Sequence, residues 1–172
     1  MTLSPPLDPA SKPPLAHERP EDAAAVGALI DRAFGPGRFA KAAERLREGN
    51  APYLHLSQTC WVDGALAGCV RMWPIRIGER PAVFLGPFAV EDAWRSRGLG
   101  AALIRAACAA TKAAGHELIL LVGDQPYFGP LGFAPVPPGR IVMPGPVGPR
   151  RVLVRALKPG ATDDLAGVVV AG

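Results

Sequence analysis

One stretch, residues 84–103 with the sequence FLGPFAVEDAWRSRGLGAAL, constrains the fold most strongly. An apolar run with strand character leads into a polar loop, and the loop opens an alanine-rich helix at Arg95-Ser96-Arg97-Gly98-Leu99-Gly100. The first turn of a helix carries unpaired N–H groups and the positive end of the helix dipole. The two glycines admit a ligand close to this backbone, and the two arginines add positive charge. The pattern therefore predicts a cradle for a pyrophosphate group.

Two other phosphate-binding designs are tested by the residues around these glycines. A P-loop ends in Gly-Lys-Ser/Thr, whereas Gly100 is followed by two alanines, so this design fails. A dinucleotide-binding turn needs a third glycine where Leu103 stands, and it follows its strand more closely than this loop does. Asp124, after the next predicted strand, resembles the ribose-binding acid of such folds. A dinucleotide site therefore stays as a minor alternative.

Composition limits the class of protein and of ligand. The chain has 172 residues, which predicts one domain, and 49% apolar residues, which is enough for a core. A net charge of +4 suits an anionic small ligand but is too weak, without a clustered basic patch, to predict nucleic-acid binding.

The three cysteines and the N-terminus bear on the cellular compartment. An odd number of cysteines without CxxC spacing favours neither a disulfide framework nor a metal site. The first residues lack the apolar stretch of a signal peptide, and no run of about 18 apolar residues predicts a membrane span. These features predict a cytoplasmic protein with no metal and no membrane association.

Periodicity and turn residues predict the order of elements. Residues 1–14 read as a flexible Pro-rich leader, 15–158 as a single domain and 159–172 as a loose tail. The expected helices are 21–34, 39–47 and 98–114, with a short helix or turn at 126–131. The expected strands are 53–62, 65–77, 82–90, 117–122 and 151–157. The order predicts an α/β fold with a mixed sheet, in which an antiparallel meander precedes one parallel crossover.

The phosphate segment resembles the acyl-CoA-binding segment of the GNAT superfamily of N-acetyltransferases, whose pattern is Q/R-x-x-G-x-G/A. Arg95, Gly98 and Gly100 match it position by position, between a strand and a helix. Residues 127–133, YFGPLGF, resemble the family's F/Y-x-x-x-G-F signature. With the order of elements, the resemblance extends over about residues 15–157.

The resemblance implies where acetyl-CoA would bind. In this family the strand before the phosphate loop splays from the next strand, and pantetheine lies in the gap. Backbone groups of 88–90 would pair with its amides, amides of 95–100 would hold the pyrophosphate, and the N–H near Phe88 would polarise the thioester carbonyl. The implied cofactor-binding residues are Phe88, Ala89, Val90, Arg95, Ser96, Arg97, Gly98, Leu99, Gly100 and Phe128.

The catalytic groups are less well defined. Many family members carry a tyrosine four residues before the glycine of the Gly-Phe pair, as the acid for the departing thiolate. Phe128 occupies this position here, and Tyr127, one residue earlier, is the candidate acid. Asp124 is the candidate base, with capping of the following turn as the alternative. His55, placed in the predicted strand 53–62, is a weaker candidate.

Together these features predict an N-acyltransferase that transfers an acetyl group from acetyl-CoA to an amine by direct attack on the thioester. The acceptor site is expected between the first two helices, the meander hairpin and the proline-rich loop 134–149. The absence of tyrosine at 128 and the lack of an acidic residue in the strand 82–90 leave one alternative open, a non-catalytic acyl-CoA-binding module or sensor. The family includes monomers and dimers, so the resemblance also allows a homodimer.

Overall fold

The computed structural model describes residues 13–172, so most of the expected leader lies outside the described residues. The α-helices are α1 Ala23–Phe34, α2 Ala42–Arg45, α3 Leu99–Ala113 and α4 Gln125–Phe128. The strands are β1 Leu15–His17, β2 Gln58–Val62, β3 Ala65–Ile77, β4 Arg80–Val90, β5 Leu118–Val122, β6 Ala134–Pro135, β7 Ile141–Val142, β8 Val152–Ala156 and β9 Gly167–Ala171.

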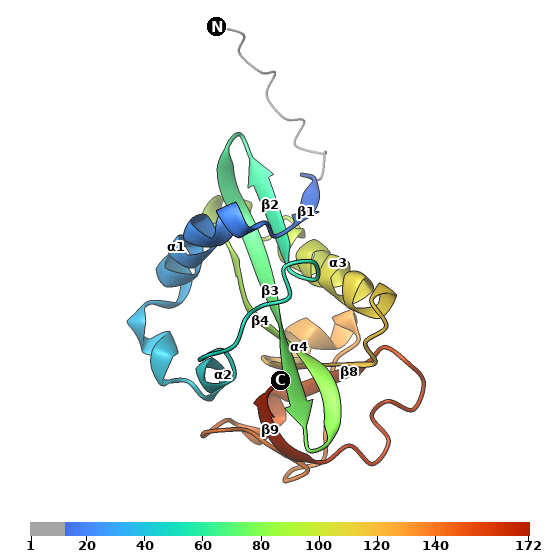
Figure 1. Ribbon diagram of the computed structural model, residues 1–172. Helices are drawn as coiled ribbons and strands as arrows, with labels where there is room; N and C mark the ends of the chain where they lie inside the picture. The colour runs from blue at the N-terminus through green and yellow to red at the C-terminus, as the bar shows by residue number, and fades with distance from the viewer. Residues whose placement is uncertain (1–12) are drawn as a thin grey trace, which may run out of the picture.

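The strands form one mixed sheet with the order β1-β2-β3-β4-β5-β8-β6, and β9 extends it beside β3 and β7. From β1 to β4 each strand pairs antiparallel with the next one, and the long β3–β4 hairpin runs through the middle of the molecule (Figure 1). β4 then pairs with β5 in parallel, with α3 as the crossover. This arrangement confirms the predicted meander and β-α-β crossover.

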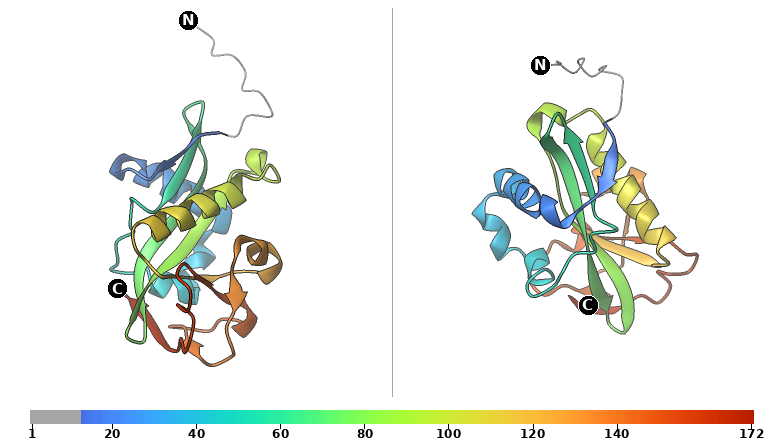
Figure 2. Two further views of the ribbon diagram at one scale, coloured as in Figure 1. Left: turned by 90° about the vertical axis from the view of Figure 1, so that its right-hand side faces the viewer. Right: turned by 45° about the horizontal axis from the view of Figure 1, so that its top comes forward.

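Helices cover both faces of the sheet. Successive strand residues point to opposite faces, and neighbours in β3 show this: Cys69 packs with Leu29 of α1, whereas Val70 packs with Leu103 of α3. Figures 1 and 2 show α1 and α2 on one side of the sheet and α3 on the other. Leu29 and Leu103 are fully buried, and burial of each such side chain contributes about 2 kcal/mol.

The C-terminal segment, predicted as a loose tail, is instead part of the sheet. β9 pairs antiparallel with the end of β3, from Ile75–Ala171 to Ile77–Val169, and β7 pairs parallel with β9. Val169 is fully buried, in one core cluster with Ile77. Figures 1 and 2 show the C-terminus beside the far end of the β3–β4 hairpin. The prediction of a loose tail was therefore wrong.

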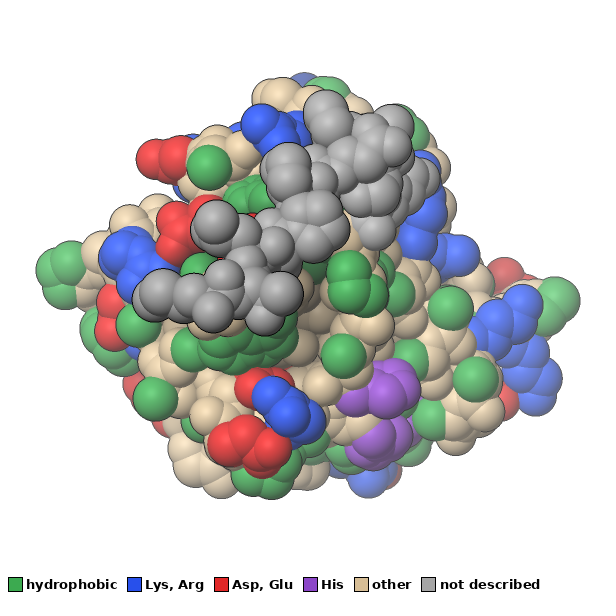
Figure 3. All heavy atoms as spheres, turned by 90° about the horizontal axis from the view of Figure 1, so that it is seen from above, with side chains coloured by type: hydrophobic (Ala, Val, Ile, Leu, Met, Phe, Trp, Pro, Cys, Tyr) green, Lys and Arg blue, Asp and Glu red, His purple; other side chains and the backbone are tan. Residues whose placement is uncertain are grey.

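The predicted strand 53–62 begins later than expected. Residues 54–56 form a turn, closed by hydrogen bonds from Leu56 N and Ser57 N to Tyr53 O, and β2 starts only at Gln58. His55 therefore lies in this turn and not in a strand. Its ring and that of His116 both contact the ring of Tyr53, with centroids 5.5 and 5.4 Å away. Histidine side chains gather at the surface in the view of Figure 3.

Candidate active site

The neighbouring parallel strands β4 and β5 separate after a short contact. Their ladder consists of two residue pairs, Val83 with Ile119 and Phe84 with Leu120. Farther along, residues 88–90 of β4 still pair with β3 on the opposite edge. No strand among the described residues pairs with 88–90 on the β5 side, which agrees with the predicted splay of the central strands.

The loop that follows β4 curls tightly before α3 begins. Ser96 has a φ of +60° and Gly98, the residue before α3, a φ of +80°, both in the left-handed region. Arg95 Nε donates a hydrogen bond to Val90 O at 3.2 Å, and its Nη1 lies 3.1 Å from Asp92 Oδ1. The side chain of Arg95 thus ties the loop to the end of β4. The N–H groups of the first turn of α3 lie beside this junction and have no partners within the helix.

Gly100 permits a close approach of other side chains to the start of α3. A Cβ atom at this position would lie 2.7 Å from Tyr127 Oη and 3.2 Å from Phe88 Cε2. The rings of Tyr127 and Phe88 stack with their centroids 5.9 Å apart. Tyr127 is therefore held against the start of α3, although it lies one residue before the family's usual position. Burial raises the pKa of the Tyr127 hydroxyl, and the charge of Arg105 opposes the rise.

A cavity of about 370 Å³ lies where these elements meet. It brings together seven of the residues predicted from the sequence with Trp94 and the end of α1. The predicted residues that line it are Phe88, Ala89, Val90, Arg95, Ser96, Gly100 and Tyr127. Their convergence supports the pyrophosphate cradle, and the roles of the individual residues stay predictions.

The other predicted cofactor residues have different surroundings. The Arg97 guanidinium lies over the Trp94 ring, 5.2 Å from its centroid. Leu99 is buried in the core beneath α3, so its side chain faces away from the cavity. The Phe128 side chain is 7% exposed and packs edge-on against Phe88. A Cβ at Gly98 would meet no protein atom. For Gly98 and Leu99 the expected cofactor contact rests on the backbone, and for Phe128 on a small exposed area, whereas Arg97 is exposed.

A second cavity, of about 590 Å³, lies on the other side of Phe88 and Tyr127 and shares Phe34 with the first. Asp124 lines it, and the Asp124 carboxylate pairs with Arg151 across a distance of 3.2 Å. Both side chains are more than half exposed. The Asp124 side chain makes no cap hydrogen bond to α4, so the capping alternative considered for this residue is not supported.

Positive charge is concentrated in the wall of this larger cavity, which sequence reasoning missed. Its cationic lining residues are Arg38, Lys41, Arg47 and Arg151. The segment 39–47 was predicted as one helix, but the structure has a 3-10 turn at Pro36–Ala40 and a short α2, separated at Lys41, whose φ and ψ are extended. The break changes which cations face inward. The basic residues in the sequence RFAKAAERLRE could have indicated a cationic wall. A continuous helix, however, would have predicted the wrong set of these residues to face the cavity.

Arg47 lies deepest among these cations. Its side chain is 12% exposed, its Nη1 lies 3.0 Å from Glu44 Oε2, and its Nε is buried without a hydrogen-bond partner among the described residues. The guanidinium lies over the Phe84 ring, 5.5 Å from the centroid. Burial lowers the pKa of Arg47, and the hydrogen bond and charge of Glu44 oppose the change. A Cβ at Gly86 would lie 3.3 Å from Arg47 Nη2, so Arg47 packs directly on β4.

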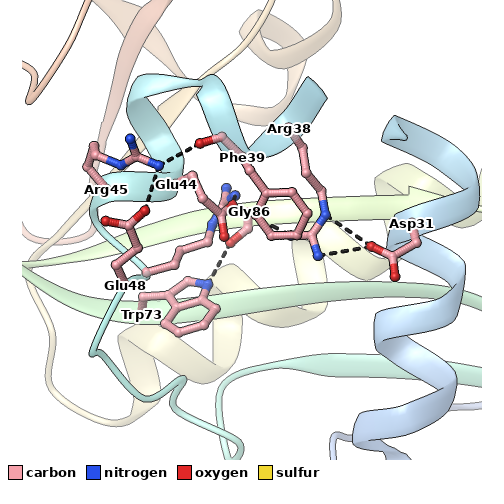
Figure 4. Close-up of polar contacts among 9 residues, drawn as sticks. Asp31, Arg38, Phe39, Glu44, Arg45, Glu48, Trp73 and Gly86 are labelled. Carbon is pink, nitrogen blue, oxygen red and sulfur yellow. Dashed lines mark hydrogen bonds and ion pairs between the residues drawn. The ribbon is translucent and has the colours of Figure 1, made fainter. Parts of the chain in front are cut away.

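The neighbouring polar contacts fix the floor and rim of the cavity (Figure 4). Arg38 bonds Asp31 Oδ1 of α1 at 2.9 Å and lies 3.5 Å from Glu44 Oε2, which Arg47 also uses. Trp73 Nε1 donates to Gly86 O at 2.7 Å and so fixes β4 just before Pro87. These contacts fix the residues around the larger cavity beside β4, where Phe88 lines both cavities.

Within residues 13–172, no group of three or more His, Cys, Asp or Glu side chains is arranged to hold a metal ion. In the same part of the chain, no helix is long and apolar enough to cross a bilayer.

The acetyltransferase (GNAT) family profile matches residues 23–129, from the start of α1 to the end of α4. The chain belongs to this family. It is 28% identical over 118 residues to an uncharacterized N-acetyltransferase of Escherichia coli K12, YhbS, a match that covers 67% of this chain and 70% of YhbS. GNAT membership supports acyl transfer as the class of reaction.

Solved GNAT structures share the fold described above. The E. coli YhbS crystal structure, determined in complex with CoA, has a TM-score of 0.77 at 25% identity, covering 96% of this chain and 92% of that one. A GNAT acetyltransferase from Brucella melitensis, determined in complex with acetyl-CoA, has a TM-score of 0.57 at 27% identity, covering 81% and 92%.

Proposed function

We propose that this GNAT protein transfers an acetyl group from acetyl-CoA to an amine acceptor. The main support is the smaller cavity, which joins the splayed end of β4 to the start of α3. The pyrophosphate would lie on the N–H groups of 95–100, where the helix dipole favours negative charge. Pantetheine would extend between β4 and β5 and hydrogen-bond to residues 88–90. The CoA and acetyl-CoA complexes of the two relatives support this donor.

The acceptor would enter through the larger cavity and meet the thioester near Phe88, which borders both cavities. The amine nitrogen attacks the thioester carbonyl carbon, and the N–H near Phe88 stabilises the developing oxyanion. The carbon–sulfur bond then breaks and gives an amide and CoA thiolate. Positioning of the two reactants supplies most of the rate enhancement in such a reaction.

Tyr127 and Asp124 are the proposed proton carriers. The raised pKa keeps the Tyr127 hydroxyl protonated at neutral pH, so it is able to protonate the departing thiolate. Asp124 lines the acceptor cavity and would take the proton that the amine loses. The ion pair with Arg151 holds the Asp124 carboxylate at the wall of this cavity.

The direct test is CoA release from acetyl-CoA in the presence of a panel of amines, with the acetylated product identified by mass. The proposal predicts CoA release that depends on both the protein and one class of amine. Acetyl-CoA binding without turnover of any amine would favour the alternative of a binding module or sensor. Failure to bind acetyl-CoA at all would overturn both.

A further inference from the structure

The cations of the larger cavity exceed the carboxylates that neutralise them. Arg38 and Arg47 share a single oxygen, Glu44 Oε2, at 3.5 and 3.0 Å. Arg38 has a second partner in Asp31, whereas Glu44 is the one carboxylate paired with Arg47 among the described residues. Lys41 adds a further charge to the same wall. The cavity therefore presents a net positive field to whatever enters it.

Arg47 is the cation whose surroundings point most clearly to a ligand. A buried charge is costly unless it is paired and hydrogen-bonded. Arg47 is 12% exposed, its Nε lacks a partner among the described residues, and it still lines the cavity. A guanidinium offers a planar set of donors that matches a carboxylate. A carboxylate entering this cavity would supply the charge compensation that Glu44 gives only in part.

Arg47 lies close to the place where the thioester is proposed to bind. Its Nη2 packs against Gly86, two residues before Phe88. Strand residues rise about 3.3 Å each, so Gly86 and Phe88 are at most about 7 Å apart along β4. An acceptor bound by its carboxylate at Arg47 would thus have its amine, a few bonds away, near the thioester. The remaining wall includes Phe34 and Val147, which suits a small apolar body.

We propose that the acceptor is a small amine that carries a carboxylate, as amino acids do, and that Arg47 binds this carboxylate. The inference rests on the proposed N-acyltransferase function and adds its substrate class. The same charges disfavour polyamines and lysine-rich peptides, because bringing a further cation next to Arg38, Lys41 and Arg47 is repulsive.

The test compares amino acids with their carboxamides, such as L-leucine with L-leucinamide, over a panel of α-, β- and γ-amino acids. Within the preferred pair, we expect the acid to have a kcat/KM at least tenfold higher than its amide. The amide has the more readily deprotonated amine, so intrinsic reactivity acts against this result. Equal or better turnover of the amides across the panel would overturn the inference and leave the acetyltransferase function intact.

Substitutions separate binding by Arg47 from a structural role. In Arg47→Gln, kcat/KM for the acid should fall at least tenfold, while the values for the amide and the KM for acetyl-CoA stay unchanged. Arg47→Lys keeps the charge and should retain part of the preference for the acid over the amide. It replaces Arg47→Gln in the test if that variant does not fold. Arg45→Gln is the matched control, because Arg45 is an arginine two residues before Arg47 that does not line the cavity and instead bonds Phe39 O and Glu48 (Figure 4). Equal losses for acid and amide in Arg47→Gln would make Arg47 merely structural and contradict the inference.

A binding measurement keeps the inference testable independently of turnover. N-acetyl-L-amino acids and their carboxamides, the products of the same panel, are titrated into the CoA-loaded protein. The carboxylate forms should bind at least tenfold more tightly, and Arg47→Gln should remove the difference. Absence of carboxylate-dependent binding would overturn the inference even where no acceptor is turned over. Failure of the proposed function would appear separately, as a lack of acetyl-CoA binding.

Discussion

Gly98 and Gly100 lie two residues apart at the start of α3 but meet different constraints. Gly98 has a φ of +80° and open space around its Cα, so a side chain there would be strained without touching protein atoms. Gly100 has ordinary helical geometry but lies against the Tyr127 hydroxyl. The sequence motif treats the two glycines alike. The structure shows that the first permits a turn and the second permits a close approach.

Gly100→Ala should therefore weaken acetyl-CoA binding. The new Cβ, 2.7 Å from Tyr127 Oη, forces the Tyr127 ring to move within the proposed donor cavity. We expect at least a tenfold increase in the Kd for acetyl-CoA, measured by calorimetry. Gly27→Ala in α1 is the control, because its Cβ meets no atom within 4 Å and should stabilise the helix by about 1 kcal/mol. Unchanged affinity in Gly100→Ala would remove Gly100 from the cradle.

Tyr127→Phe tests the proposed acid. Removing the hydroxyl should lower kcat by about 10²-fold, because the thiolate loses its proton donor, while the Kd for acetyl-CoA stays the same. Burial raises the pKa of Tyr127 from the ordinary tyrosine value of about 10, so the hydroxyl stays protonated up to that pH. At any pH below about 10, wild-type activity should therefore show no loss caused by ionisation of Tyr127. Tyr53→Phe, which removes a hydroxyl from the turn before β2, should leave the rate unchanged. An unchanged rate in Tyr127→Phe would assign the proton to water.

The three cysteines should be inert in the folded protein. Cys60, Cys69 and Cys108 are buried, and burial raises the pKa of Cys69 to about 12. The thiolate is the reactive form, so a raised pKa suppresses reaction. At pH 8 a thiol reagent should label none of the three before unfolding and all three after it. Rapid labelling of the native protein would contradict the burial described here.

At the scale of elements, β9 shows where local pattern fails. Its sequence GVVVA follows a Gly- and Asp-rich turn and looks like a loose end, since nothing local identifies a partner strand. The far end of the β3–β4 hairpin provides that partner, at Ile75–Ile77. Strand pairing between residues about 90 positions apart is a tertiary property. The strand prediction for Tyr53–Leu56 also fails, because local hydrogen bonds hold these strand-like residues in a turn.

Substitutions in β9 test its place in the sheet. Val169 is fully buried, whereas Val170 is 46% exposed on the opposite face of the strand. Val169→Ala should lower the free energy of unfolding by about 2 kcal/mol, and Val170→Ala by about 0.5 kcal/mol or less. Denaturant titration of both variants measures the difference. Equal effects would indicate that the segment is a loose tail after all.

The elements of the phosphate site were predicted from the sequence because their signals are local. A strand, a loop and a helix that begins at two glycines occupy one continuous stretch. The next strand in the chain, β5, is the one that separates from β4. Arg47 could not be found in this way. Its place beside Gly86 depends on the break at Lys41 and on how the turn after α2 brings Arg47 against β4.

At the scale of the whole molecule, the two cavities meet at Phe34, Phe88 and Tyr127. One is bordered by the start of α3 and the loop before it, and the other by the cations Arg38, Lys41, Arg47 and Arg151. This arrangement lets donor and acceptor approach the same part of β4 from opposite sides. This arrangement is consistent with the proposed direct attack of the amine on the thioester, and the three cysteines are all buried.

The measurement that tests this account most directly is a calorimetric titration of the protein with acetyl-CoA, with NAD as the control ligand. The account predicts one acetyl-CoA bound per chain with a micromolar Kd, and no heat from NAD. Absence of acetyl-CoA binding would show that the loop at 95–100 is not the cradle described here. Binding of NAD in its place would restore the dinucleotide alternative and contradict the central claim.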